Sequence, residues 1–149
     1  MRRFRFSLQT LLELRESREL EARRRVAAQN AAIAQLDHLD RLTASEIARQ
    51  QATLLAAQHS GSLEPLALQR GHAWIAHLRK TMAQRSAQRD ALKTELSALQ
   101  AAWHAARRDA RAVQKLRERR YSRHLKDRQR YDQAVADDLA RQLPLFEPV

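Results

Sequence analysis

Residues 75–113 read IAHLRKTMAQRSAQRDALKTELSALQAAWHAARRDARAV and contain the most regular apolar pattern of the chain. Apolar side chains recur in it at alternating intervals of three and four residues, and ten of the twelve ladder positions are apolar. The ladder positions are Ile75, Leu78, Met82, Arg85, Arg89, Leu92, Leu96, Leu99, Trp103, Ala106, Ala110 and Val113. A mean spacing of about 3.5 residues keeps one seam of a helix facing a partner helix, so the stretch predicts a coiled coil.

The composition of the 149-residue chain favours long helices over a compact mixed domain. It contains two glycines, three prolines and no cysteine, and Ala, Leu, Arg and Gln dominate. No segment approaches the roughly 20 consecutive apolar residues of a membrane span. The basic start, Met1–Phe6, is not followed by the apolar region of a signal peptide. The absence of cysteine suits a reducing compartment, so we expect a soluble, cytoplasmic protein. From the helix-favouring composition we expect the all-α class.

A single break divides the helical pattern. Gly61 and Pro65 lie close together in the stretch His59–Pro65, where they stop a helix and permit chain reversal. The predicted organisation is therefore a long helix over 1–58, a connection over 59–72, a second long helix over 73–141 and a flexible tail over 142–149. This predicts an antiparallel two-helix coiled-coil hairpin with unequal arms and an extended C-terminal tail.

The first predicted helix has a seam that polar residues interrupt. One seam column is Leu12, Glu19, Val26, Ile33, Asp40, Ile47 and Leu54. The other is Leu8, Arg15, Ala22, Gln29, Leu36, Thr43 and Gln50. Polar residues at core positions cost stability but fix the register, and they disfavour a tight symmetric dimer. We therefore expect a monomeric hairpin.

The apolar pattern of the second helix changes phase after Val113. It continues at Leu116, Tyr121, Leu125, Tyr131, Val135 and Leu139. This part is more polar, and the second arm is the longer one. Residues 116–140 are therefore expected to project beyond the end of the shorter arm.

Positive charge is concentrated in the second half of the chain. The formal net charge is +11, and residues 101–131 alone carry eleven Lys or Arg against three Asp or Glu. The candidate partner-binding residues in this block are Lys115, Arg117, Arg119, Arg120 and Arg123. Such a surface attracts carboxylate clusters of a protein partner, nucleic acid or anionic lipid, and it is also the composition of an ordinary solvated helix face. The Asn and Ala residues with which basic-zipper regions contact bases are missing from the block.

Residues arranged for catalysis are not found. The six histidines lack the i,i+4 pairing of a helical zinc site, and neither glycine lies in a phosphate-binding loop. We therefore expect a protein that is not an enzyme and needs no metal or cofactor. The peptide Gln142–Phe146, QLPLF, is similar to the motif that docks bacterial proteins on the sliding clamp of DNA polymerase. A clamp-tethered accessory factor and a nucleic-acid-binding hairpin are thus alternative functions.

Two stretches of the chain resemble the FliJ family of flagellar type III export stalk proteins, which has injectisome relatives of the YscO type. The first is Phe4–Glu16, FRFSLQTLLELRE, with its paired aromatics and Leu-x-x-Leu-Leu run. The second is Lys115–Arg119, KLRER, and Asp137–Ala140 lies where many members carry Asp-Glu-x-Ala.

The resemblance implies a stalk that enters the hexameric export ATPase and promotes its assembly. It also implies contacts with the membrane export gate and with export chaperones, and a cytoplasmic location at the inner-membrane export apparatus. For a stalk protein we do not expect nucleic acid as a partner. Residues near 4–25 and 110–135 would enter the ATPase ring. The N-terminal partner-binding residues would then be Phe4, Phe6, Leu8, Leu11, Leu12 and Arg15.

Overall fold

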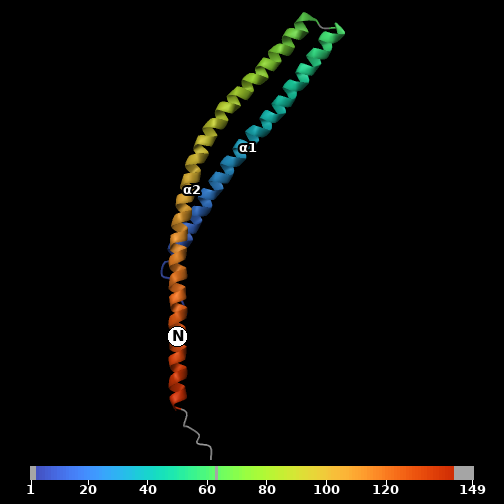
Figure 1. Ribbon diagram of the computed structural model, residues 1–149. Coiled ribbons are helices and arrows are strands. Elements are labelled where there is room, and N and C mark those ends of the chain that lie inside the picture. Colours follow the sequence, from blue (N-terminus) through green and yellow to red (C-terminus); the bar gives the residue numbers. More distant parts are fainter. Residues whose placement is uncertain (1–2, 63, 143–149) are drawn as a thin grey trace, which may run out of the picture. The chain divides into compact units, whose positions relative to one another are not determined.

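The computed structural model describes residues 3–62 and 64–142, which form two helices, α1 (Gln9–Ser60) and α2 (Pro65–Gln142) (Figure 1). No strand occurs in these residues, and the two helices pack against each other as a helical hairpin. The predicted all-α class is thus confirmed. The extended tail predicted for 142–149 lies, beyond Gln142, outside the described residues.

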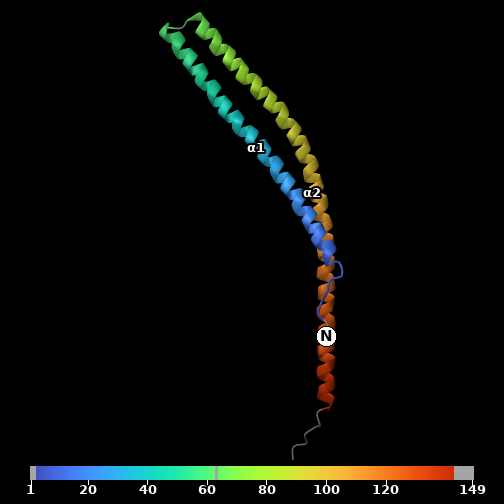
Figure 2. The same ribbon diagram turned by 180° about the vertical axis from the view of Figure 1, so that it is seen from behind.

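The chain divides into two compact units, and each helix contributes to both. The terminal unit comprises Met1–Leu20 and His104–Val149, and the turn unit comprises Glu21–Trp103. Within the turn unit, α1 and α2 run side by side in opposite directions in both views (Figure 1, Figure 2).

The turn between the helices is tight. Gly61 has a φ of +67°, the left-handed conformation in which a helix commonly ends, and its N–H donates to the carbonyl of Gln58 at 3.3 Å. Pro65 is the first residue of α2, where its missing N–H costs no helical hydrogen bond. The chain between Ser60 and Pro65 is therefore much shorter than the connection predicted over 59–72.

The prediction placed Gly71 in the connection, but this glycine lies inside α2. A Cβ atom at Gly71 would lie 2.6 Å from Cδ2 of Leu54, so the glycine marks a close approach between the two helices. One glycine inside a helix costs only about 1 kcal/mol relative to alanine, and the contact with Leu54 offsets part of that cost.

The ladder of α2 forms the seam that its spacing predicts. In the turn unit, every ladder position from Ile75 to Trp103 is buried or half-buried. In the terminal unit the same holds for Ala106, Ala110 and Val113. Both predicted seam columns of α1 are likewise covered. Because few of these side chains are fully buried, the core is a narrow line of contacts along the helix pair.

The two charged ladder positions of α2 meet acidic residues of α1. Arg85 donates to Thr43 Oγ1 at 2.7 Å and pairs with Asp40 at 3.5 Å, and Arg89 also pairs with Asp40. The Nε of Arg89 lies 2.7 Å from Oδ1 of Asp37, an ion pair without the alignment of a hydrogen bond. The Asp40 side chain is only 14% exposed, so these charges lie within the seam. A single charged layer in a coiled coil disfavours other registers, because a shift of one helix along the other would leave the buried charges without partners.

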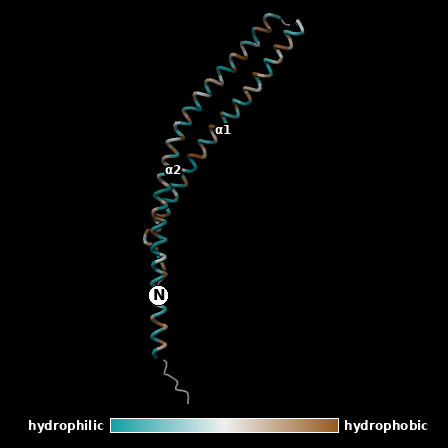
Figure 3. Tube along the Cα trace, viewed as in Figure 1, coloured by the Kyte–Doolittle hydropathy of each residue, from teal (hydrophilic) through white to brown (hydrophobic). Residues whose placement is uncertain are grey.

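Hydropathy changes repeatedly along both helices, as the alternating colours show (Figure 3). Among residues 3–62 and 64–142, no helix combines the length and apolar character needed to cross a membrane.

Candidate functional site

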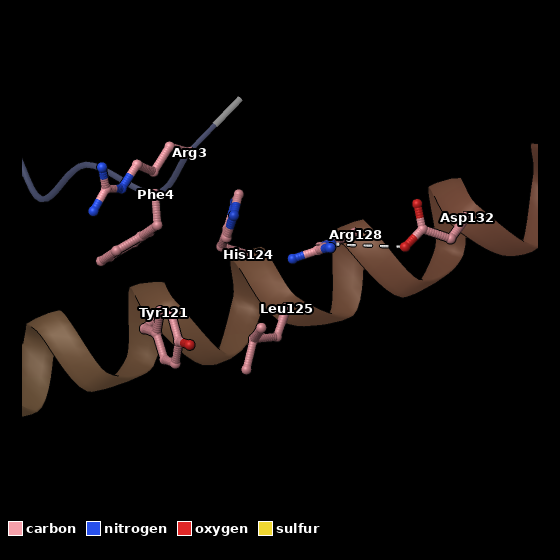
Figure 4. Close-up of a pocket in the computed structure, with 7 residues that line it drawn as sticks. All are labelled: Arg3, Phe4, Tyr121, His124, Leu125, Arg128 and Asp132. Carbon is pink, nitrogen blue, oxygen red and sulfur yellow. Dashed lines mark ion pairs between the residues drawn. The ribbon is translucent and has the colours of Figure 1, made fainter. Parts of the chain in front are cut away.

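The N-terminal segment, residues 3–8, packs on α2 within the terminal unit. The Phe4 ring meets Tyr121 edge-on, with 5.2 Å between ring centroids, and lies 5.5 Å from the ring of His124 (Figure 4). These three rings border a hollow of about 620 Å³ that extends along α2 over Leu125 and Arg128. The contact fixes the segment beside the helix before α1 begins.

A second contact joins this segment to the basic block. The guanidinium of Arg120 lies 5.7 Å from the centroid of the Phe6 ring, and its Nη1 donates a hydrogen bond to Ser7 Oγ at 2.9 Å. Phe6 is 9% exposed. Arg120 therefore binds the N-terminal segment and offers less of its charge to a partner than its neighbours on α2 do.

The remaining N-terminal candidates take part in packing within the terminal unit. Leu8 and Leu11 are half-buried, and Leu12 is 1% exposed. Arg15 donates to Asp109 of α2 at 2.9 Å. Phe6 and Leu12 thus have little free surface, and Phe4 is the N-terminal candidate that borders an open hollow.

The other candidate cations divide between different faces of α2. Lys115, Arg119 and Arg123 line one groove of about 450 Å³, together with Lys126, Glu118 and Ser122. Within the described chain, none of these four cations has an ion-pair partner. The remaining candidate, Arg117, is exposed and does not line this groove. We call Lys115, Arg119, Arg123 and Lys126 the basic groove.

The basic groove is suited to binding several carboxylates at once. Its cations recur at intervals of four, four and three residues, so they follow one face of the helix over about three turns. Arginine presents a planar fork of donors that matches a carboxylate, and each exposed cation keeps its charge for a partner. Sequence reasoning missed Lys126, although the same spacing rule extends the row from Lys115 to it.

A model of the FliJ family, described as flagellar FliJ protein, matches residues 4–145. The chain belongs to the FliJ family. No curated protein and no solved structure matches it.

The match spans both halves of the terminal unit. FliJ-family membership makes the chain a component of the flagellar protein export apparatus, active in protein transport and flagellum biogenesis. The matched residues include the N-terminal segment and the whole basic groove. The tail motif over Gln142–Phe146 overlaps the match up to Leu145, but it lies almost entirely outside the described residues.

The turn unit of this FliJ-family chain has a hollow of its own, which sequence reasoning did not find. It measures about 670 Å³ and is bordered by Leu54, Ala67, Gly71 and Trp74. Trp74 is 45% exposed and stacks on His77 at 5.5 Å between ring centroids. Beside it, Gln50 donates to Glu46 at 3.0 Å, and this hydrogen bond, with the charge of Arg49, lowers the pKa of Glu46.

The described residues hold no group of three or more His, Cys, Asp or Glu side chains placed to bind a metal ion.

Proposed function

We propose that this chain is the non-enzymatic coiled-coil stalk of the export apparatus and that its terminal unit enters the hexameric export ATPase. The observation that carries the proposal is the basic groove, which presents four cations without ion-pair partners in the described chain along one face of α2. Membership of a flagellar export family supports the choice of partner.

The basic groove would act by attracting carboxylates that line the ATPase ring. Exposed charges of one sign raise the rate of association and orient the partners, and they contribute less to affinity than a buried contact does. Lys115, Arg119, Arg123 and Lys126 carry this role, and Arg117 adds an exposed charge outside the groove. Such contacts allow a helix to enter a ring without becoming immobile in it.

The N-terminal segment would give the inserted end a defined surface. Phe4 and Phe6 hold it on α2, and Arg120 joins it to the basic block. Leu8, Leu11 and Leu12 start the seam, while Arg15 joins α1 to α2 through Asp109. In this proposal these residues shape the binding surface, and Phe4 also contacts the ring.

The stalk would promote assembly of the ATPase hexamer and connect it with the membrane export gate and the export chaperones. With these partners the protein would lie in the cytoplasm, peripheral to the inner membrane. Their support is the family relationship and not a particular contact in the structure.

The test is a titration of the export ATPase with this chain, following both hexamer formation and ATP turnover. The triple change Lys115→Glu, Arg119→Glu, Arg123→Glu should abolish the stimulation that the unchanged chain produces. The matched control, Arg24→Glu, Arg79→Glu, Lys93→Glu, alters the same number of exposed cations in the turn unit and should preserve it. Equal behaviour of the two variants would contradict the proposal.

Nucleic acid is the alternative ligand for the basic groove, and salt distinguishes it. Binding through phosphates releases counterions, so the affinity for any duplex would fall steeply with salt concentration. Strong, salt-sensitive binding to DNA together with no effect on the ATPase would favour the nucleic-acid hairpin.

A further inference from the structure

The far end of α2 carries an apolar seam that the rest of the described chain covers only in part, where Phe4 packs on Tyr121 at its first position. Every residue of 125–142 is exposed, and α2 continues here past the N-terminal segment (Figure 1). The exposed fractions of Tyr121, Leu125, Val135 and Leu139 are 48, 39, 40 and 59%. Such a row of large apolar side chains on a helix surface indicates a binding face.

The row has coiled-coil spacing when two charged residues are included. Tyr121, Leu125, Arg128, Asp132, Val135 and Leu139 follow one another at intervals of four, three, four, three and four residues. Arg128 and Asp132 occupy the two central positions and pair with each other along the helix at 3.7 Å, both more than 60% exposed. The seam is therefore apolar at its ends and carries one charge of each sign at its centre.

The seam is complementary to itself when a second copy runs antiparallel to it. In an antiparallel coiled coil the first seam position of one helix lies opposite the last seam position of the other. Here this pairs Tyr121 with Leu139 of the second copy. The next layer pairs Leu125 with Val135 of the second copy. The central layer pairs Arg128 with Asp132 of the second copy, and the two-fold axis repeats all three layers.

The positions that flank this seam agree with the antiparallel arrangement. On one side, Tyr131 meets Tyr131 of the second copy at the axis, and His124 lies opposite Asp138. On the other side, Gln129 meets Gln129 of the second copy. No like charges oppose each other in either flank. A parallel pair would instead place Arg128 against Arg128 and Asp132 against Asp132, which is repulsive.

We propose that residues 121–139 bind the same residues of a second copy of this chain as a short antiparallel coiled coil. The hollow beside Phe4 is lined by Tyr121, Leu125, Arg128 and Asp132, four of the six seam residues (Figure 4). Leu139 and Val135 of the second copy would fill it. The polar seam of α1 led us to expect a monomer, but this pairing uses a different part of the chain.

The dimer is expected to be weak and dependent on concentration. Its seam covers fewer than three heptads, and two of its six layers are charged pairs, which give specificity at a cost in stability. The inference does not rest on the proposed stalk function. Since both use the same end of α2, a chain bound in the ATPase ring would not be paired.

Sedimentation equilibrium of the full chain at concentrations up to about 1 mM would detect even a dimer with a dissociation constant in that range. Variants of the central layer, Arg128 with Asp132 of the second copy, then test the pairing. Arg128→Asp alone or Asp132→Arg alone opposes like charges twice and should raise the dimer dissociation constant by about tenfold or more. The double change Arg128→Asp, Asp132→Arg restores opposite charges and should restore the dimer. Arg130→Asp, on the outer face of the same helix, is the control and should have little effect. Circular dichroism would verify that all variants remain helical.

Disulfide cross-linking tests the orientation, because the chain has no cysteine of its own. Chains carrying Leu125→Cys should cross-link with chains carrying Val135→Cys, whereas neither should cross-link with itself. Self-cross-linking of either variant would indicate a parallel pair. That result, a monomer over the whole concentration range, or a dimer that Arg128→Asp does not weaken would overturn the proposal.

Discussion

Arg120 of α2 holds Ser7 of the N-terminal segment by a hydrogen bond of 2.9 Å from Nη1 to Oγ, while its guanidinium covers the ring of Phe6. Most of the neighbouring cations are exposed to solvent. Arg120 differs from them because it contacts the N-terminal segment and so has a structural role. This contact connects two parts of the sequence that lie 113 residues apart.

Replacing Arg120 by alanine should loosen the N-terminal segment. The lost hydrogen bond and cation–π contact together contribute about 1 kcal/mol at an exposed site, which corresponds to an increase of about fivefold in the population of the open segment. Trypsin cleavage after Arg5, followed by mass spectrometry, measures this opening. Arg119→Ala is the control, since Arg119 has no contact with the segment in the described structure. Equal cleavage of the two variants would show that Arg120 does not hold the segment.

The charged layer of the seam should be sensitive to the loss of its shared carboxylate. Asp40→Ala removes the carboxylate that pairs with both Arg85 and Arg89 inside the seam. We therefore expect the free energy of unfolding, measured with urea, to fall by about 2 kcal/mol. Glu21→Ala breaks the exposed Glu21–Arg25 pair and should change stability by less than about 0.5 kcal/mol. A comparable effect of the two changes would argue against a structural role for the charged layer.

The two glycines should respond differently to alanine. Gly61→Ala forces a side chain into the left-handed region and should destabilise the turn by about 1 kcal/mol, although space is available around it. Gly71→Ala gains about 1 kcal/mol of helix propensity, which crowding against Leu54 offsets, so its net effect should be small. Thermal unfolding of both variants shows which of the two changes lowers the stability more. If Gly71→Ala were the more damaging, the Leu54 contact would be tighter than described.

The pKa of Glu46 should depend on Gln50. The hydrogen bond from Gln50 is the largest cause of the lowered pKa, so Gln50→Leu should raise the pKa of Glu46 toward its ordinary value. A carboxyl whose pKa is lower in the folded state stabilises folding above its unfolded pKa, and this stabilisation is lost as the pH falls through the folded pKa. A titration of the Glu46 side chain by NMR, in the unchanged chain and in the variant, measures the pKa. An unchanged pKa in the variant would assign the shift to Arg49 instead.

Most of the fold could be predicted from periodicity, because the ladder of α2 is regular and free of glycine and proline from Ile75 to Val113. Gly71 was misjudged, since a sequence cannot reveal that Leu54 of the other helix lies against it. The contact of Asp40 with Arg85 could not be predicted, because it depends on the register between the helices. The contact of Phe4 with Tyr121 could not be predicted either, because it depends on how the segment before α1 packs on α2. Lys126, in contrast, could have been assigned to the basic groove from spacing along one helix.

In the proposed complex the terminal unit, and not the turn unit, lies against the export ATPase. Site-specific photo-cross-linking tests it most directly, with a photoreactive amino acid in place of Ser122 in the basic groove and, in a second chain, in place of the exposed Ser86 of the turn unit. We expect a covalent adduct with the ATPase from position 122 and none from position 86. Adducts from position 86 alone, or from neither position in a complex that still forms, would contradict it.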